Sequence, residues 1–310
     1  MRIALLGQQK FGKAALDAFI ERGHLIAGVF CAPDKPGAAP DPVKTAAQSR
    51  GVPVHQLPSL RSESAREILR SLDADLAVMA YVLQFVPQEF TAVPVHGTIQ
   101  FHPSLLPRYR GPSAINWPII HGDTVTGLTI FRPTDGLDEG PVILQKETPI
   151  GPDDTLGGVY FERLFPMGVA ALLEAADLVA QGAGSGVVQD ESLASYEGWC
   201  RAPESRINWH NHVDIIYNLV RGCDPSPGAW TTWNGKKLQL FEARKHPLRR
   251  FSQMTAEVGA VSKLGERSLR IGAHGGEIEV LKVKYGDGDK QPAAQFCADQ
   301  GIAVGALLGA

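Results

Sequence analysis

The first 30 residues restrict the fold more than any other part of the chain. Residues 2–7 form a short apolar run, residues 11–22 have a helical pattern, and residues 25–30 form a second run rich in branched and aromatic side chains. Two strands joined by a helix pair in parallel, because the helix carries the chain back to the edge where the first strand began. The opening therefore predicts an α/β fold built on a Rossmann-like, mostly parallel sheet.

The turn after the first strand runs from Gly7 to Gly12. It lacks the closely spaced second glycine of the dinucleotide-binding fingerprint, in which the backbone approaches a pyrophosphate. We therefore interpret it as a tight strand-to-helix connection and not as a nucleotide site.

Length and charge exclude several classes of protein. A chain of 310 residues is long enough for two ordinary domains, and 44% hydrophobic with 20% charged residues is typical of a soluble globular protein. No apolar run approaches the roughly 20 residues that span a bilayer, and the amino terminus reads directly as a strand and not as a signal peptide. With a net charge of −3, we expect a cytoplasmic protein with neither a nucleic-acid nor a membrane partner.

A histidine stands where a buried strand is expected to end. Residues 98–101 form an apolar-leaning run that reaches His102, and Pro103 then removes a backbone donor and turns the chain out of the sheet. Open α/β sheets place ligands at the carboxyl ends of their strands. His102 is therefore a candidate functional residue.

An acidic residue follows the next predicted strand. Residues 127–132 form that strand, and the turn-rich loop after it carries Asp138. A histidine and a carboxylate on neighbouring strand-end loops can act as a general acid/base pair, in which the carboxylate orients the imidazole and stabilises its cation.

The predicted secondary structure changes from mostly helical to mostly short strands after about residue 190. A long helical region, 155–181, has a break near Pro166 and is followed by a Gly-rich stretch, 182–189, that reads as a linker. An amphipathic helix at 211–221, a hairpin signal at Asn234-Gly235 and several short strands follow. We predict a catalytic domain at 1–200 and a smaller β domain at 201–310.

The sequence shows no metal-binding pattern. The four cysteines and the histidines outside the predicted strand have no ligand spacing, and the acidic loop at 135–139 lacks the alternation of a calcium loop. The residues considered were Cys31, Cys200, Cys223, Cys297, His121, His210 and His212. We expect buried thiols and no metal.

These segments resemble a known family. The enzymes that use 10-formyltetrahydrofolate as formyl donor carry Asn-x-His, then Ser-Leu-Leu-Pro, then an Asp in a Gly-Leu-Asp-x-Gly loop 36 residues after the His. His102, the Ser-Leu-Leu-Pro at 104–107 and Asp138 fit this pattern, while Gln100 stands at the Asn position. Stretches 101–104, 114–117, 120–123 and 144–147 are most similar to the amino-terminal, formyl-hydrolysing domain of 10-formyltetrahydrofolate dehydrogenases.

The resemblance implies a formyltransferase fold with an OB-like C-terminal β-barrel, and it assigns roles to the residues. His102 would carry the proton, Asp138 would support it, and Gln100 would either contact the formyl oxygen or only pack. A folate pocket is implied at Tyr81, Leu83, Gln84, Phe85, Val86, Leu137 and Asp138, although plain core packing also explains the run at 80–87. Arg108 and Arg110 either reach an acidic group of a ligand or belong to a solvated loop.

Two acceptors for the formyl group remain open. Water would give tetrahydrofolate and formate, as in the formyl-hydrolysing domain. An amine on an amino sugar or another small metabolite would give an N-formyl product. A third interpretation, from a different class, is a folate-binding protein without catalysis.

Overall fold

The computed structural model describes residues 1–248 and 257–309. The chain divides into two compact units, which are described separately. The first comprises Met1–Gly111, Gly127–Thr148 and Arg163–Tyr196, and the second comprises Pro112–Thr126, Pro149–Glu162 and Glu197–Ala310. Residues 112–126 and 149–162 thus belong to the second unit, although the residues on both sides of each segment belong to the first.

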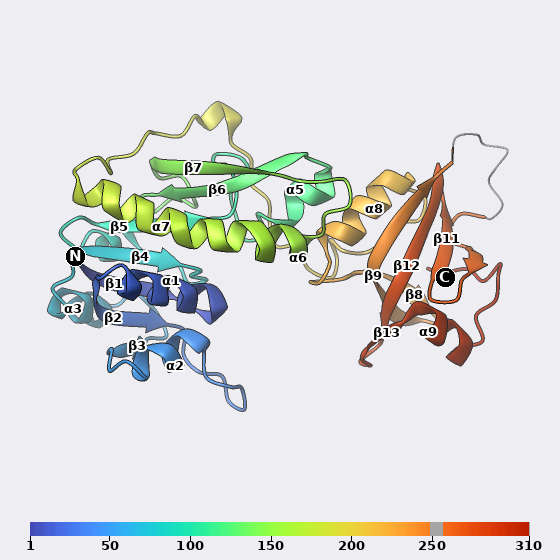
Figure 1. Cartoon of the computed structure of the whole chain (residues 1–310), viewed down its shortest axis with the longest axis horizontal. Helices are drawn as coiled ribbons and strands as arrows, with labels where there is room; N and C mark the ends of the chain where they lie inside the picture. Colours follow the sequence, from blue (N-terminus) through green and yellow to red (C-terminus); the bar gives the residue numbers. More distant parts are fainter. Residues whose placement is uncertain (249–256, 310) are drawn as a thin grey trace. The chain divides into compact units, whose positions relative to one another are not determined.

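The first unit contains a seven-stranded sheet and the helices that cover it (Figure 1). Its elements are β1 (Arg2–Gly7), α1 (Gln9–Glu21), β2 (Leu25–Cys31), α2 (Pro42–Gln48), β3 (Val54–Gln56), α3 (Glu63–Ser71), β4 (Leu76–Ala80), α4 (Gln88–Thr91), β5 (Thr98–His102), β6 (Val125–Phe131), β7 (Val142–Pro149) and α7 (Phe165–Ala180), with a short 3₁₀ turn η2 (Glu191–Leu193). The strand order is β3-β2-β1-β4-β5-β6-β7.

The sheet is mostly parallel, as the opening of the sequence predicts. Strands β3, β2, β1, β4 and β5 pair in parallel. Strand β6 is antiparallel to β5, with His102 opposite Thr129 and Gln100 opposite Phe131. The chain therefore leaves β6 beside the beginning of β5, and the loop 132–141 has to lead back toward His102.

Helices cover both faces of this sheet. Helix α1 contacts β1, α2 and α7, and α7 contacts β5, so these three helices lie on one face. On the other face Ala65 and Leu69 of α3 and Phe90 of α4 pack against Leu6 and Met79 of β1 and β4. Ser62 caps α3 by accepting a hydrogen bond from the amide of Ala65 at 3.2 Å.

The predicted helical region 155–181 is interrupted. A one-turn α6 (Leu156–Gly158) and a π-helical η1 (Val159–Leu164) precede α7, and Pro166 lies in the first turn of α7. A proline fits there because the amides of a first turn have no helical acceptor. The predicted break near Pro166 is confirmed.

The second unit contains an antiparallel sheet and several short helices. Its elements are α5 (Asn116–His121), α6, η1, α8 (Val213–Gly222), β8 (Ala229–Trp233), β9 (Lys236–Pro247), β10 (Val261–Leu264), β11 (Leu269–Ala273), β12 (Gly276–Tyr285), β13 (Lys290–Pro292) and α9 (Ala293–Asp299). The order is β10-β11-β12-β9-β8, and β13 also pairs with β12. The predicted Asn234-Gly235 turn joins β8 to β9, with φ of 48° and 71°.

Candidate active site

His102 ends β5 with its side chain on the face that α3 and α4 cover. Strand residues alternate between faces. Phe101 points to the α1 side, where its ring centroid lies 4.5 Å from that of Phe11. Thr98, on the same face as His102, donates its hydroxyl hydrogen to the Thr91 carbonyl oxygen of α4 at 2.6 Å. The position of His102 thus follows from the register of one strand.

Both ring nitrogens of His102 face protein atoms. Nε2 lies 2.9 Å from the carbonyl oxygen of Tyr109, and because a carbonyl oxygen only accepts, Nε2 carries a hydrogen. Nδ1 lies 3.6 Å from Oδ2 of Asp138. The carboxylate of Asp138 can therefore orient the imidazole and stabilise its cation during a proton transfer.

Asp138 is held in place by backbone geometry. Its φ of 55° lies in the left-handed region, which a non-glycine residue adopts at a cost that functional sites often bear. Its Oδ2 accepts the amide hydrogen of Gly111 at 2.9 Å. The side chains of His102 and Asp138 are only 7% and 8% exposed. Little water therefore screens an electrostatic interaction between the two side chains.

The Ser-Leu-Leu-Pro loop fixes the carbonyl that binds His102. The Ser104 hydroxyl donates to the carbonyl oxygens of Arg108 and Tyr109, at 2.7 and 3.2 Å. Thr129 donates to the Ser104 carbonyl and accepts the Leu106 amide hydrogen. The serine in this pattern thus has a structural role. Its hydroxyl holds the loop so that the Tyr109 carbonyl can orient the imidazole of His102.

Gln100 lies two residues before His102 on the same strand face. Its side chain is half-buried, and its amide has no hydrogen-bond partner among the residues that the structure describes. An amide donor left free beside His102 is available to a ligand.

The predicted folate residues divide into an exposed set and a buried one. Tyr81, Leu83, Phe85 and Leu137 are large apolar side chains that are 39%, 55%, 44% and 51% exposed. Val86 is buried in the core under α3 and α4. Gln84 donates its amide hydrogen to the carbonyl of Leu57 at 3.2 Å. Val86 therefore has the core role that the sequence left open, and the exposed set is free to contact a ligand.

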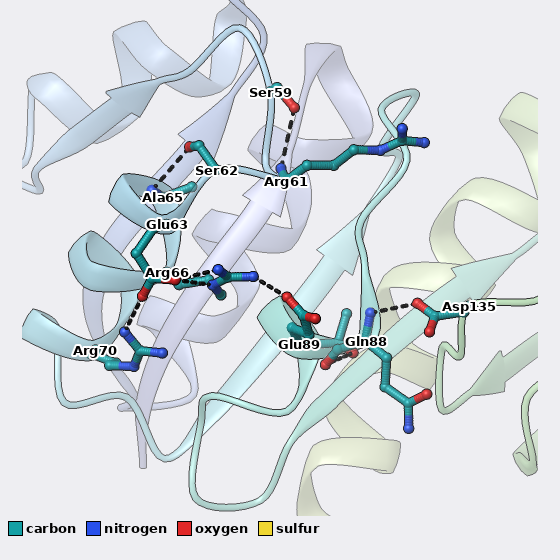
Figure 2. A network of polar contacts seen from close by, with 11 residues as sticks. Ser59, Arg61, Ser62, Glu63, Ala65, Arg66, Arg70, Gln88, Glu89 and Asp135 are labelled. Carbon is teal, nitrogen blue, oxygen red and sulfur yellow. Dashed lines mark hydrogen bonds and ion pairs between the residues drawn. The ribbon is translucent and has the colours of Figure 1, made fainter.

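The loops that carry the exposed set are tied together. The amide of Gln88, after the first loop, donates to Oδ1 of Asp135, in the second loop, at 2.8 Å (Figure 2). Beside this bond Glu89 pairs with Arg66. Arg61 extends away from that pair, with its guanidinium carbon 4.6 Å from the ring centroid of Phe85.

A separate pocket opens at the carboxyl ends of β1, β2 and β4. It is open to solvent, and its cavity volume is only about 20 Å³. Its lining includes the predicted residues Tyr81, Leu83 and Gln84 but not Phe85 or Leu137. The predicted folate residues are thus not gathered around this one pocket.

Arg110 is neither solvated nor available to a ligand. It is buried and donates to both carboxylate oxygens of Glu191, at 2.9 and 2.6 Å, and to Oε1 of Gln189. This hydrogen bond to Glu191 raises the pKa of Arg110. No local pattern indicates that Gln189 and Glu191 bind Arg110, because Arg110 lies about 80 residues earlier in the chain.

The described residues hold four unlinked thiols and no metal-type cluster. All four cysteines are buried, and the sulfur atoms of Cys200 and Cys223 lie 3.8 Å apart in the core of the second unit. The spatial proximity of these two was not expected from their spacing. In residues 1–248 and 257–309, no group of three or more His, Cys, Asp or Glu side chains could hold a metal ion. In the same ranges no helix is long and apolar enough to cross a membrane.

Comparisons with known proteins decide the family. Residues 1–175 match the family model described as formyl transferase, and residues 201–301 match the model described as formyl transferase, C-terminal domain. The chain belongs to the formyl transferase family. The resemblance that the sequence motifs indicated is thus confirmed.

The relatives of this chain include proteins of two kinds. It is 39% identical over 308 residues to the cytosolic 10-formyltetrahydrofolate dehydrogenase of Mus musculus, covering 96% of this chain and 34% of that protein. The chain is also 35% identical over 313 residues to the methionyl-tRNA formyltransferase of Syntrophus aciditrophicus, covering 99% of this chain and 98% of that protein. The chain thus spans about a third of the length of the dehydrogenases that it matches.

Solved structures confirm the fold. HypX from Aquifex aeolicus, in complex with tetrahydrofolic acid, superposes with a TM-score of 0.70 at 19% identity, over 96% of this chain and 47% of that one. At this identity the likeness shows the fold alone. The predicted Rossmann-like sheet with a smaller C-terminal β domain is therefore confirmed.

Proposed function

We propose that this formyl transferase removes the formyl group from 10-formyltetrahydrofolate and passes it to water, giving tetrahydrofolate and formate. The observation that carries the proposal is the buried His102–Asp138 pair, with 3.6 Å between Nδ1 and Oδ2. Acyl transfer needs a proton carrier, and a carboxylate within reach can orient and charge it.

The chemistry of this reaction follows from the positions of these groups. Water adds to the formyl carbon as it passes a proton to the His102–Asp138 pair, and the formyl oxygen becomes an oxyanion. The bond between that carbon and N10 then breaks, and N10 receives a proton from the pair. The free amide of Gln100, on the same strand face as His102, would donate to the oxyanion.

The folate would lie over the two loops that carry Tyr81, Leu83, Phe85 and Leu137. Large exposed apolar groups favour a flat heteroaromatic ligand, which removes them from water. The Gln88–Asp135 hydrogen bond links the two loops. The guanidinium of Arg61 lies over Phe85, where it can meet the carboxylates of the folate's glutamate tail. No metal enters this proposal.

A second candidate is transfer to an amine. It is supported by the match to a methionyl-tRNA formyltransferase over 98% of that protein's length. Water is favoured by Gln100, which replaces the Asn of the transferase pattern. The same site serves both acceptors, since the proton carrier and the formyl donor are unchanged.

One experiment separates the candidates. The purified chain is incubated with 10-formyltetrahydrofolate, and absorbance is followed with and without added amines. Turnover without an amine supports hydrolysis, whereas turnover only with an amine supports transfer. Binding without turnover under every condition would leave a folate-binding protein, and absence of binding would refute all three.

A further inference from the structure

A segment far from the catalytic pair in sequence contacts both of the loops that carry it. Residues 189–195, here called the strap, follow the Gly-rich stretch that the sequence presents as a linker. In the structure the amide groups of Val187 and Val142 exchange hydrogen bonds at 2.8 Å, and Gln189 is buried. The chain is therefore fixed here and is not a free linker.

The first arm of the strap holds the Asp138 loop. Nε2 of Gln189 donates to the carbonyl oxygens of Asp138 and Gly140, both at 2.8 Å. One side-chain amide thus binds the backbone on both sides of Glu139. This places the Asp138 carboxylate, because the direction of a side chain follows from its backbone.

The buried Arg110 holds Gln189 in turn. Its Nη2 and Nε atoms lie 2.9 and 3.3 Å from Oε1 of Gln189, which leaves the Gln189 amide hydrogens for the loop. Glu191 binds the same guanidinium with both carboxylate oxygens. Bidentate carboxylate contacts fix a guanidinium in direction as well as in distance.

The second arm holds the His102 loop. The hydroxyl oxygen of Ser195 accepts the amide hydrogen of Tyr109 at 2.9 Å. The Ser195 carbonyl accepts the Arg110 amide hydrogen at 2.9 Å, and its own amide donates to the Pro107 carbonyl at 3.1 Å. Since the Tyr109 carbonyl binds Nε2 of His102, this arm determines the orientation of the imidazole.

We propose that the strap aligns His102 with Asp138, and that Gln189 is the positioning residue that sets the Asp138 side of the pair. Gln189 touches neither reacting atom and acts through the backbone of the loop. The proposal rests on the proposed function, because the alignment of His102 with Asp138 matters for turnover only if the pair transfers protons in that reaction. If the Gln189 contacts served stability alone, their loss would affect turnover equally with and without the Asp138 carboxylate.

The test is a double-mutant cycle on turnover. Gln189→Ala should lower kcat for 10-formyltetrahydrofolate by about 10- to 100-fold, as expected when a reacting group is misplaced by up to about 1 Å. The KM should change less than kcat, because the first folate loop, which carries Tyr81, Leu83 and Phe85, is not touched. In an Asp138→Ala background the same change should alter kcat by less than about twofold, since no carboxylate remains to be placed.

Two further variants keep the test decisive. Gln189→Glu retains an oxygen for Arg110 but loses both donors to the loop, so it should lower kcat as Gln189→Ala does. If Gln189→Ala does not fold, Gln189→Glu takes its place in the test. The matched control is Gln239→Ala, which removes a similar amide bond, to the Pro227 carbonyl at 2.8 Å in the second unit. It should leave kcat unchanged. Equal losses of kcat in the parent and Asp138→Ala backgrounds, or an unchanged kcat in Gln189→Ala, would overturn the proposal.

A readout without substrate separates this proposal from the proposed function. The ¹⁵N signals of the His102 ring report which nitrogen carries hydrogen and which faces a charge. They should shift in Gln189→Ala and stay unchanged in Gln239→Ala. If the parent does not turn over formylfolate, the proposed function fails, and these signals alone decide on the strap. Unshifted signals in Gln189→Ala would refute it.

Discussion

His102 donates its Nε2 hydrogen to the carbonyl oxygen of Tyr109 at 2.9 Å. This bond assigns the two ring nitrogens different roles, since only Nδ1 is left to face Asp138. The imidazole is thus oriented by backbone on one side and by charge on the other. The predictions below start from this arrangement.

Removing the imidazole should abolish most of the catalysis. His102→Ala is expected to lower turnover of 10-formyltetrahydrofolate at least about 100-fold, the lower end of what a positioned proton carrier supplies. Folate affinity, measured by fluorescence or calorimetry, should largely persist. His210→Ala, at an exposed histidine of the second unit, is the control and should keep parental turnover. Near-normal turnover in His102→Ala would refute the role of His102.

Two substitutions at Asp138 separate its charge from its position. Asp138→Asn keeps an oxygen that can accept the Gly111 amide hydrogen but cannot stabilise an imidazolium. Asp138→Ala loses both. If charge dominates, both variants should lose about 100-fold or more in kcat. If Asp138→Asn retains most of the activity, the carboxylate only maintains the loop, and its proposed support of the imidazole cation is wrong.

The amide of Gln100 is expected to act in the transition state. Gln100→Ala should cost about 3 kcal/mol, on the order of 100-fold in kcat, if the amide donates to the oxyanion. The KM should change little, because the bond strengthens only as charge develops. Gln100→Asn shortens the reach by one methylene and should restore only part of the activity. Hydrolysis within a few-fold of the parent in both variants would show that Gln100 merely packs.

The exposed apolar residues should govern folate affinity and not the chemical step. Phe85→Ser and Leu137→Ser remove apolar surface from the two linked loops. Each should raise the KM about 10-fold or more, from the roughly 1.5–3 kcal/mol of burying such a side chain, with kcat nearly unchanged. Leu264→Ser, at an exposed leucine of the second unit, is the matched control. An unchanged KM in both loop variants would place the folate elsewhere.

The last residue of the Gly-Leu-Asp-x-Gly loop, Gly140, has no room for a side chain. A Cβ atom on Gly140 would lie 1.6 Å from the carbonyl oxygen of Arg132, whereas one on Gly136 would meet the flexible end of the Glu139 side chain. Gly140→Ala should therefore shift the backbone, destabilise the protein by about 1–3 kcal/mol and lower turnover. Gly136→Ala should cost less in both, which thermal unfolding and kinetics can compare. Equal effects would show that backbone crowding is not the cause.

Acid should weaken the strap through Glu191. The hydrogen bond from Arg110 lowers the pKa of Glu191 below its ordinary value of 4.5, although burial and the nearby Asp190 act in the opposite direction. A lowered pKa means that the contact stabilises the fold above the ordinary value and that this contribution is lost as the pH falls through the folded pKa. The difference in Tm between the parent and Glu191→Gln should therefore be largest near neutrality and vanish in acid. A difference that grows below pH 4.5 would contradict this assignment.

The sequence by itself determined the class of fold and the family. The βαβ pattern of residues 2–30 predicts parallel pairing because a helix between two strands leaves few other solutions. Local signals of the same kind identified the Asn234-Gly235 turn and the break near Pro166. The spacing of His102, Ser104 and Asp138 was sufficient to indicate the family.

Only the tertiary structure decided how the candidate site is held together. Strand β6 is antiparallel to β5, so Asp138 meets His102 through a long loop and not at a shared carboxyl edge. That Val86 lies in the core, that Arg110 is buried, and that Gln189 grips the Asp138 loop could not be read from the chain. The domain division at residue 200 and the roles of the site residues stay predictions. Strand periodicity and turn chemistry act between neighbours in sequence, whereas the partners of Arg110 and Gln189 are brought together only when the whole sheet has formed.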